Sequence, residues 1–347
     1  MSEQRSTSEV FTDICDRLRD DIVGMDETIR LLIAAVFSGG HCLLEGVPGL
    51  AKTLLISRTA ALMGLDFSRI QFTPDLMPSD LTGAEVIAED KQTGERNFVF
   101  LKGPVFANVV LADEINRTPP KTQAALMEAM EEHQVTSLGQ RFDVPQPFFV
   151  LATQNPIEQE GTYPLPAAQL DRFLFNLDVD YPEHDNERRI VRMTCRNRSS
   201  TDEAIVDREE ILRHMVATQN MYVSKDILRY ATNIVRRTRP ADADAPSRVN
   251  KFVAFGGGPR AAQALIMGAK ALAAFRGDRE PSAADIRDLL VPVLKHRVLL
   301  NFVGKADGLS VQSILHDVIE STDAPDGYRV PARKTQRRFF GLLPARG

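Results

Sequence analysis

The 347-residue sequence contains no tryptophan, only three cysteines and no long hydrophobic run. Its longest apolar stretches, such as Leu31–Phe37, are too short to cross a bilayer, which takes about 20 apolar residues. The first ten residues, MSEQRSTSEV, are polar and lack the apolar core of a signal peptide. Cys15, Cys42 and Cys195 have neither disulfide nor metal-ligand spacing. These absences predict a cytoplasmic protein with reduced thiols and no membrane insertion.

The sequence also lacks an excess of positive charge. Its 42 Lys and Arg against 47 Asp and Glu give a net charge of −5, which provides no bulk attraction to nucleic acids or anionic membranes. Hydrophobic residues make up 43% of the chain, which is ordinary for a globular protein. The length allows one large domain or two moderate ones, each with its own core.

Two patterns divide the sequence. From about residue 20 to 182, short apolar runs alternate with helical segments, which is typical of a parallel α/β sheet. The strand candidates are His41–Glu45, Ile70–Phe72, Val109–Ala112, Phe148–Thr153 and Phe173–Val179. From residue 183 onward helical patterns dominate, with candidates at 187–196, 205–217, 226–237, 259–275 and 283–298, and Ser224 and Ser282 are good N-caps. We therefore predict an N-terminal helix or tail (1–19), an α/β core (20–182), a helical domain (183–322) and a basic tail (323–347).

Two hairpins are predicted as insertions into the sheet. Glu85–Leu101 has two strand-like halves around Gln92-Thr93-Gly94, and Val135–Val144 has two around Leu138-Gly139-Gln140. The last segment, Arg329–Gly347, has six Lys or Arg and no acid. It is either a solvated tail or a docking peptide.

A glycine-rich loop follows the first strand candidate. Its residues are Gly46-Val47-Pro48-Gly49-Leu50-Ala51-Lys52-Thr53, and a predicted helix follows them. This order is that of a phosphate-binding P-loop, in which backbone N–H groups and the helix N-terminus surround the phosphates. We expect Lys52 to reach the β- and γ-phosphates of ATP and Thr53 to give its hydroxyl to Mg²⁺. Ala51 replaces the glycine of the strict pattern, which we expect to be tolerated if this residue has helical dihedral angles.

Two adjacent acids, Asp113 and Glu114, end the apolar strand candidate Val109–Ala112. Neighbouring side chains on a strand face opposite ways, so the two acids are suited to different tasks. We expect Asp113 to hold Mg²⁺ through its water shell and Glu114 to polarise the attacking water. Two acids at a strand end are commonly only solvated, and their position after the P-loop favours the catalytic interpretation.

An asparagine and two arginines complete the predicted site. Asn155 follows the next apolar strand, where its amide could align the γ-phosphate and the water. Arg172 precedes the fifth strand and is expected to point toward a neighbouring subunit. Arg260 follows Gly256-Gly257-Gly258-Pro259 at the start of a helix in the second domain, where it could close over the nucleotide. Arginine suits both tasks because it stays charged and offers a planar fork to phosphate oxygens.

As an ordered set, EGVPGLAKT, VVLADEINR, LATQNP, YPLPAAQLDRF and GGGPRA resemble the motifs of the MoxR-type AAA+ ATPases over roughly residues 20–300. The resemblance implies a P-loop AAA+ αβα core with a parallel sheet, followed by an all-helical lid domain. It also implies Mg²⁺-dependent ATP hydrolysis in a ring of identical subunits, usually a hexamer, with ATP bound between subunits.

The resemblance assigns further roles. It makes Gly46–Thr53 the Walker A motif, Asp113-Glu114 Walker B, Asn155 sensor 1, Arg172 the arginine finger and Arg260 sensor 2. It places Ile22-Val23-Gly24 against adenine and identifies the two hairpins as the helix-2 insert and the pre-sensor-1 hairpin. Ala167 stands where the family usually has glutamate, which puts a contact between subunits in doubt. Arg117 is a second candidate for the arginine at that interface.

Four functions are compatible with this motif set. The first is a chaperone-like motor that acts on a protein client, because the family is linked to metalloenzyme maturation with a von Willebrand factor A (VWA) domain partner. The second is a nucleic-acid motor, which the mixed charges of SLGQRFD and EDKQTGER disfavour, since tips that track phosphates should be basic. The third is the motor subunit of a metal chelatase. The fourth is a P-loop kinase or NTPase switch, which would not need an arginine on a second domain.

Overall fold

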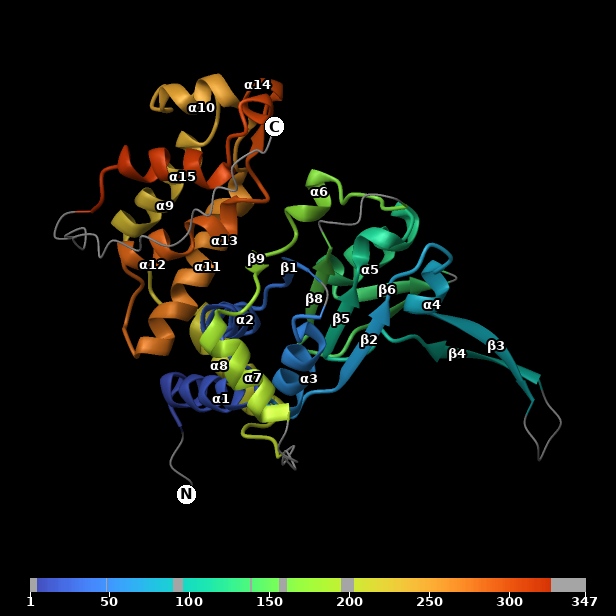
Figure 1. Ribbon diagram of the computed structural model, residues 1–347. Helices are drawn as coiled ribbons and strands as arrows, with labels where there is room; N and C mark the ends of the chain where they lie inside the picture. The colour runs from blue at the N-terminus through green and yellow to red at the C-terminus, as the bar shows by residue number, and fades with distance from the viewer. Residues whose placement is uncertain are drawn as a thin grey trace.

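A five-stranded parallel sheet forms the centre of the first half of the chain, in the order β2-β5-β8-β1-β9 (Figure 1). Its strands are β1 Cys42–Gly46, β2 Phe67–Gln71, β5 Val109–Asp113, β8 Phe149–Gln154 and β9 Phe175–Val179. All four neighbouring pairs run parallel. The five predicted strands and the parallel α/β class are therefore confirmed.

The computed structural model describes residues 5–47, 49–89, 96–137, 139–155, 161–194 and 203–325. Several features predicted from the sequence lie outside these residues: Pro48 of the P-loop, Leu138 and the turn Gln92-Thr93-Gly94 of the hairpins, Cys195, and the basic tail from residue 326 onward.

Helices cover both faces of the sheet because alternate strand residues point to opposite sides. Leu111 packs in one hydrophobic cluster with helices α2 (Asp26–Ser38) and α3 (Lys52–Leu62). Its neighbour Val110 packs in a second cluster with α5 (Pro120–Glu132). The central strands β1, β5 and β8 are largely apolar on both faces for this reason, as is usual for a parallel sheet between two helical layers.

From residue 184 onward, the described residues are helical apart from one short antiparallel pair. Its elements are α7 His184–Thr194, α8 Arg208–Gln219, α9 Lys225–Arg237, α10 Ser247–Phe252, β10 Val253–Phe255, α11 Pro259–Arg276, α12 Ala283–Asp288, α13 Leu290–Leu294, β11 Leu299–Leu300, α14 Phe302–Ala306 and α15 Val311–Glu320. Ser224 and Ser282 cap α9 and α12 as predicted. Within the described residues, no helix combines the length and hydropathy that a bilayer span needs.

The single helix predicted over 283–298 is wrong, since the segment forms two short helices. Leu289 ends α12 with φ −88° and ψ −3°, and Pro292 lies in α13. Proline has no N–H to bond to the carbonyl four residues earlier, so a continuous helix through this point would lose a hydrogen bond.

Both predicted hairpins are present as antiparallel pairs. They are β3 Gly83–Glu89 with β4 Arg96–Lys102, and β6 Gln134–Ser137 with β7 Gln140–Asp143. The β3–β4 ribbon extends away from the sheet (Figure 1). Phe100 of β4 stacks on Phe142 of β7 with ring centroids 4.1 Å apart, so the bases of the two hairpins pack together. The remaining short elements are α4 Pro78–Thr82, the 3-10 turn Ile115–Arg117 and α6 Ala167–Leu170.

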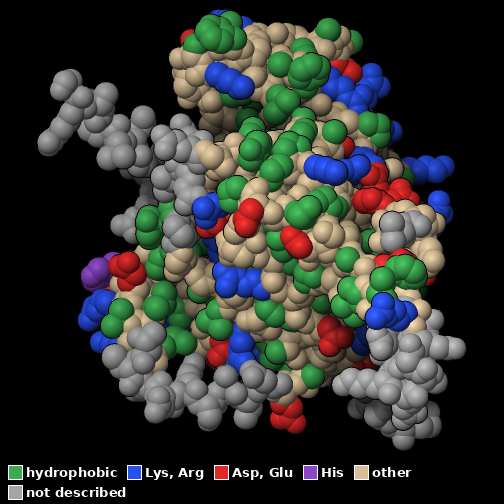
Figure 2. Space-filling model, turned by 90° about the vertical axis from the view of Figure 1, so that its right-hand side faces the viewer, with side chains coloured by type: hydrophobic (Ala, Val, Ile, Leu, Met, Phe, Trp, Pro, Cys, Tyr) green, Lys and Arg blue, Asp and Glu red, His purple; other side chains and the backbone are tan. Residues whose placement is uncertain are grey.

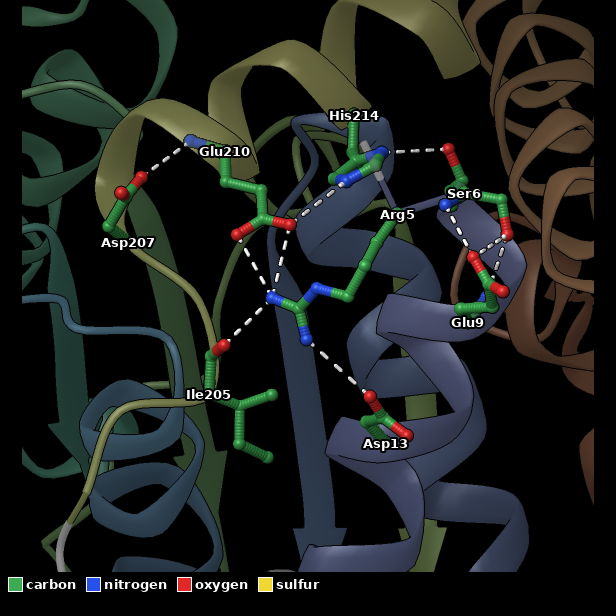
Figure 3. A network of polar contacts seen from close by, with 9 residues as sticks. Arg5, Ser6, Glu9, Asp13, Ile205, Asp207, Glu210 and His214 are labelled. Carbon is green, nitrogen blue, oxygen red and sulfur yellow. Dashed lines mark hydrogen bonds and ion pairs between the residues drawn. The ribbon is translucent and has the colours of Figure 1, made fainter. Parts of the chain in front are cut away.

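The N-terminal helix α1 (Thr7–Asp21) joins the two halves of the molecule. Arg5, just before it, binds the carboxylate of Glu210 and the carbonyl of Ile205 (Figure 3). The hydroxyl of Thr7 contacts His214 of α8. Within α1, the hydroxyl of Ser8 donates to the Phe275 carbonyl of α11. The N-terminal helix is thus packed into the fold, and the boundaries we drew at residues 19, 182 and 322 stay predictions.

His41, just before β1, is buried between β8 and α5. The N–H of Val150 donates to its Nδ1 at 3.1 Å, so Nε2 carries the ring proton and donates to the Met130 carbonyl at 3.2 Å. Burial lowers the pKa of His41 from 6.5 to about 4. The native fold therefore requires the neutral ring.

We predict that stability falls as the pH drops from 6.5 toward 4, because the unfolded chain takes up a proton on His41 that the folded chain refuses. The pKa shift from 6.5 to about 4 corresponds to about 3 kcal/mol. Urea unfolding followed by circular dichroism from pH 7.5 to 4.5 measures this loss. His41→Asn is the control, because its Oδ1 can accept from Val150 and does not titrate. A variant that loses as much stability as the parent over this range would contradict the assignment.

Candidate functional site

The register of the sheet brings the predicted motifs to one edge. Glu45 of β1 lies beside Gln154 of β8, and Gln71 of β2 lies beside Asp113 of β5. The strands therefore end at nearly the same level, and the residues that follow them surround a cavity of about 460 Å³. Its lining includes Gly46, Gly49, Leu50, Ala51, Lys52, Thr53, Asp113, Glu114 and Asn155. Ligands of open α/β sheets bind at this edge.

The P-loop connects β1 to α3. Gly46 is required because a Cβ there would lie 2.3 Å from the carbonyl oxygen of Val179 on β9. Lys52 is the first residue of α3, and its Nζ donates to the carbonyl of Gly46. Burial lowers the pKa of Lys52, while Asp113 and Glu114 act in the opposite direction. The Lys52 ammonium group thus lines the same cavity as Asp113 and Glu114, while its hydrogen bond goes to the Gly46 carbonyl.

Ala51 does not have the helical dihedral angles that we expected. It is the N-cap of α3 with φ 53° and ψ 21°, in the left-handed region. A Cβ in this region costs about 1–2 kcal/mol. The loop therefore holds a strained alanine where the strict pattern has glycine, and such strain commonly lies at ligand-binding loops.

Thr153 of β8 organises the two acids at the end of β5. Its hydroxyl donates to Asp113 Oδ1 at 2.7 Å and accepts from the backbone N–H of Glu114 at 2.9 Å. Thr153 is buried, and Glu114 has a left-handed backbone with φ 57°. One hydroxyl thus fixes the carboxylate of the first acid and the unusual backbone of the second.

Three cationic or amide groups contact these acids from the same chain. Arg69 of β2 donates to Asp113 Oδ2 at 2.7 Å. Gln71 and Arg117 donate to Glu114 Oε2 at 2.9 and 2.8 Å. The hydroxyl of Thr53 and the carboxylate of Asp113 suit Mg²⁺, which prefers oxygen ligands. A metal held through Asp113 Oδ2 requires Arg69 to turn away, and Arg117 lies beside Glu114 of its own chain.

A second cavity of about 1180 Å³ adjoins the first. The two share Gly49, Leu50, Ala51 and Leu54. Val23 and Gly24 line the second cavity together with residues of α7 such as Ile190, and Gly24 has φ 83°, which favours glycine. Phosphates at the first cavity and a base at the second would together extend along one continuous space.

Arg172 and Arg260 meet at a different place. Both guanidinium groups pair with the carboxylate of Glu131, near the end of α5. A hydrogen bond from Arg260 and a second from Arg172 hold the pKa of Glu131 below its ordinary value. Among the described residues that line the two cavities, neither arginine appears. In this structure Arg260 pairs with Glu131, and its expected closure over the nucleotide stays a prediction.

Sequence reasoning missed Thr153, Arg69 and Glu131. The signal for Thr153 was available, since it is the first polar residue in an otherwise apolar strand. Arg69 and Glu131 carry no local signal, because each is defined only by what the fold brings beside it.

A P-loop at the carboxyl edge of an αβα core, followed by helical elements, defines a nucleotide-binding domain of the AAA+ class. Comparison with known families agrees: the model of the ATPase family associated with various cellular activities (AAA) matches residues 41–175, and the AAA lid domain model matches residues 245–318.

Three proteins show the relationship over most of the chain. Chaperone MoxR1 of Mycobacterium tuberculosis is 40% identical over 311 residues, covering 89% of this chain and 81% of that protein. The uncharacterized protein YeaC of Bacillus subtilis is 38% identical over 94% of this chain and 98% of its own. A crystal structure of a candidate ATPase from Cytophaga hutchinsonii superposes with a TM-score of 0.85 at 38% identity, covering 91% of this chain and 95% of that one. The chain belongs to the MoxR family of AAA+ ATPases.

We predict that Thr153→Val impairs both stability and hydrolysis. The substitution keeps the shape but leaves the Glu114 N–H without an acceptor, which costs about 1–3 kcal/mol. Thr153→Ser is the matched control because it keeps the hydroxyl. Urea unfolding of the nucleotide-free protein and a phosphate-release assay measure the two effects. Equal hydrolysis rates in the valine and serine variants would show that the hydroxyl does not organise the acids.

Proposed function

We propose that this protein is a Mg²⁺-dependent ATPase that works as a ring of identical subunits, most simply a hexamer, and acts on a protein client. The observation that carries the ATPase proposal is the gathering of Lys52, Thr53, Asp113, Glu114 and Asn155 around one cavity at the carboxyl edge of the sheet. The proposed domains are the nucleotide-binding core over 20–182 and the lid over 183–322.

The residues of the cavity divide the chemistry among themselves. Lys52 and the backbone of Gly46–Lys52 bind the phosphates, and Val23 and Gly24 bind the base. Thr53 and Asp113 hold Mg²⁺, which neutralises charge on the phosphate oxygens when bound. Glu114 accepts a proton from the attacking water, and Asn155 orients that water toward the terminal phosphate. Thr153 supports this division because it fixes Asp113 and Glu114 in different orientations.

The position of Arg172 supports a site completed by a second subunit. Its guanidinium pairs with Glu131 rather than with the cavity of its own chain. Within the described residues, its Nε is buried without a hydrogen-bond partner. We therefore assign Arg172 to the γ-phosphate bound by a neighbouring copy, and we keep Arg260, which pairs with the same Glu131, as the proposed sensor that closes over the nucleotide. Ala167 begins α6, just before Arg172, so the missing glutamate affects the same region.

The hairpins are the proposed contact with a protein client. On the β3–β4 ribbon, Ile87 and Phe98 pair across the strands and are 62% and 74% exposed. Exposed apolar side chains along the ribbon suit a polypeptide better than a phosphate backbone, which needs basic ones. The face from which the ribbon projects carries acidic, basic and hydrophobic side chains intermixed (Figure 2). These features favour a protein remodeller over a nucleic-acid motor.

We infer the nature of the client from the family. One relative is named a chaperone, and we propose a client of the kind that the family resemblance implies: a metalloenzyme or complex matured with a VWA-domain partner. A chelatase motor remains the alternative and shares the same ATP site. The proposed location is the cytoplasm, in keeping with two buried, unpaired thiols at Cys15 and Cys42. Burial raises the pKa of Cys15 to about 12, so this thiol stays protonated.

We predict that Lys52→Ala abolishes nucleotide binding, whereas Glu114→Gln binds ATP and barely turns it over. Loss of the base should lower kcat by about 10²–10⁴-fold. Binding of a fluorescent ATP analogue and phosphate release separate the two defects. A Glu114→Gln protein with full kcat would remove Glu114 from the role of base.

We predict that Arg172→Ala keeps ATP binding and loses hydrolysis, and that mixing it with Lys52→Ala protein restores part of the activity. The mixture pairs an intact cavity on one subunit with an intact arginine on the other. Phosphate release across a titration of the two proteins measures this complementation. Full activity of unmixed Arg172→Ala would overturn the assignment between subunits.

A further inference from the structure

The turn Lys295-His296-Arg297 lies between α13 and β11 of the lid. It binds the segment of the core that carries Arg172. Lys295 forms an ion pair with Asp178 and lies 3.5 Å from Glu45. His296 Nε2 donates to the carbonyl of Phe173 at 3.1 Å; it is the proton donor because a carbonyl can only accept. This turn therefore contacts the core through side chains, from a part of the chain more than a hundred residues away.

Arg297 makes the densest of these contacts. Its Nε donates to Asp171 Oδ1 at 2.7 Å, and one terminal nitrogen donates to the carbonyls of Asp171 and Phe173 at 3.0 and 2.7 Å. The other terminal nitrogen donates to the carbonyls of Leu174 and Val293 at 3.2 and 2.6 Å. A guanidinium has five N–H groups, so these five bonds use all of them. The Arg297 side chain is only 4% exposed.

The geometry of this contact centres on Arg172. Arg297 binds the carbonyls of the residues on either side of it, Asp171 and Phe173, through the same nitrogen. In the same segment, the N–H of Leu174 donates to the His41 carbonyl at 2.8 Å. The backbone at Arg172 is therefore fixed between the start of β1 and the lid.

We propose that Arg297 is a positioning residue for ATP hydrolysis. It fixes the backbone of Arg172, so the position of Arg172 toward the neighbouring subunit depends on the lid of its own chain. The inference rests on the proposed role of Arg172 between subunits. Arg297 touches neither cavity; it acts through the carbonyls of the arginine-bearing segment. A lid that shifts would carry this segment with it.

A complementation experiment with assigned roles tests the proposal. Arg172→Ala subunits supply the cavity, and Lys52→Ala subunits supply the arginine. Arg297→Lys keeps the positive charge but cannot reproduce the five-bond fork. It is introduced either into the arginine-supplying subunit, as Lys52→Ala/Arg297→Lys, or into the cavity-supplying subunit, as Arg172→Ala/Arg297→Lys.

We expect an asymmetric result. Arg297→Lys in the arginine-supplying subunit should lower the complemented kcat by about 100-fold, since a misplacement of about 1 Å can have this effect. In the cavity-supplying subunit it should leave the complemented rate within about twofold of the reference pair, because that subunit contributes no Arg172 and its own cavity does not contain Arg297.

Arg276→Lys is the matched control for general damage to the lid, because Arg276 forms ion pairs with Asp278 and Asp285 within the lid. Placed in either subunit, it should not reproduce the asymmetry. An equal loss from both placements of Arg297→Lys, or none, would overturn the positioning role. Failure of the reference pair itself would instead overturn the assignment of Arg172 between subunits, and with it the inference.

Discussion

Parallel pairing of β1, β8 and β5 in one register is the constraint on which the site depends. It places the P-loop, the acids after β5 and Asn155 after β8 at one level, so that residues more than a hundred positions apart line a single cavity. A shift of one residue would turn every side chain of a strand to the other face. The two hydrophobic clusters oppose such a shift, because alternate strand residues pack against helices on opposite sides.

The backbone is strained at two positions of this edge of the sheet. Ala51 and Glu114 both have left-handed backbones, one before Lys52 and one after Asp113. The hydroxyl of Thr153 holds the second of these conformations by accepting from the Glu114 N–H. The surrounding sheet supplies the stability that such positions cost. The same sheet begins with a buried neutral histidine, His41, whose two ring nitrogens connect β8 to α5.

The sequence predicted the features that arise locally or from periodicity. The five strands, both hairpins and the caps at Ser224 and Ser282 follow from apolar alternation, turn residues and side-chain capping. The prediction failed where backbone geometry or tertiary contacts decide. Ala51 was expected to have helical dihedral angles, and no sequence pattern reports the sign of φ there. One continuous helix was expected across Pro292. No local pattern identifies Glu131 or Arg297. The arginines that pair with Glu131 and the carbonyls that accept from Arg297 come near them only in the folded chain.

Arg172 precedes β9 of the core, and Arg260 lies in α11 of the lid. They share one carboxylate on α5, and the lid turn holds the backbone of the first. Each subunit is thus proposed to contribute a cavity on one side and Arg172 on the other. A cryo-EM map of the full chain with Mg²⁺ and a non-hydrolysable ATP analogue tests this directly. The account predicts one nucleotide per subunit, with its phosphates against Lys52 and Thr53 and Arg172 of the adjacent copy at the terminal phosphate. A nucleotide bound away from Lys52, or one whose terminal phosphate meets Arg172 of the same chain, would contradict it.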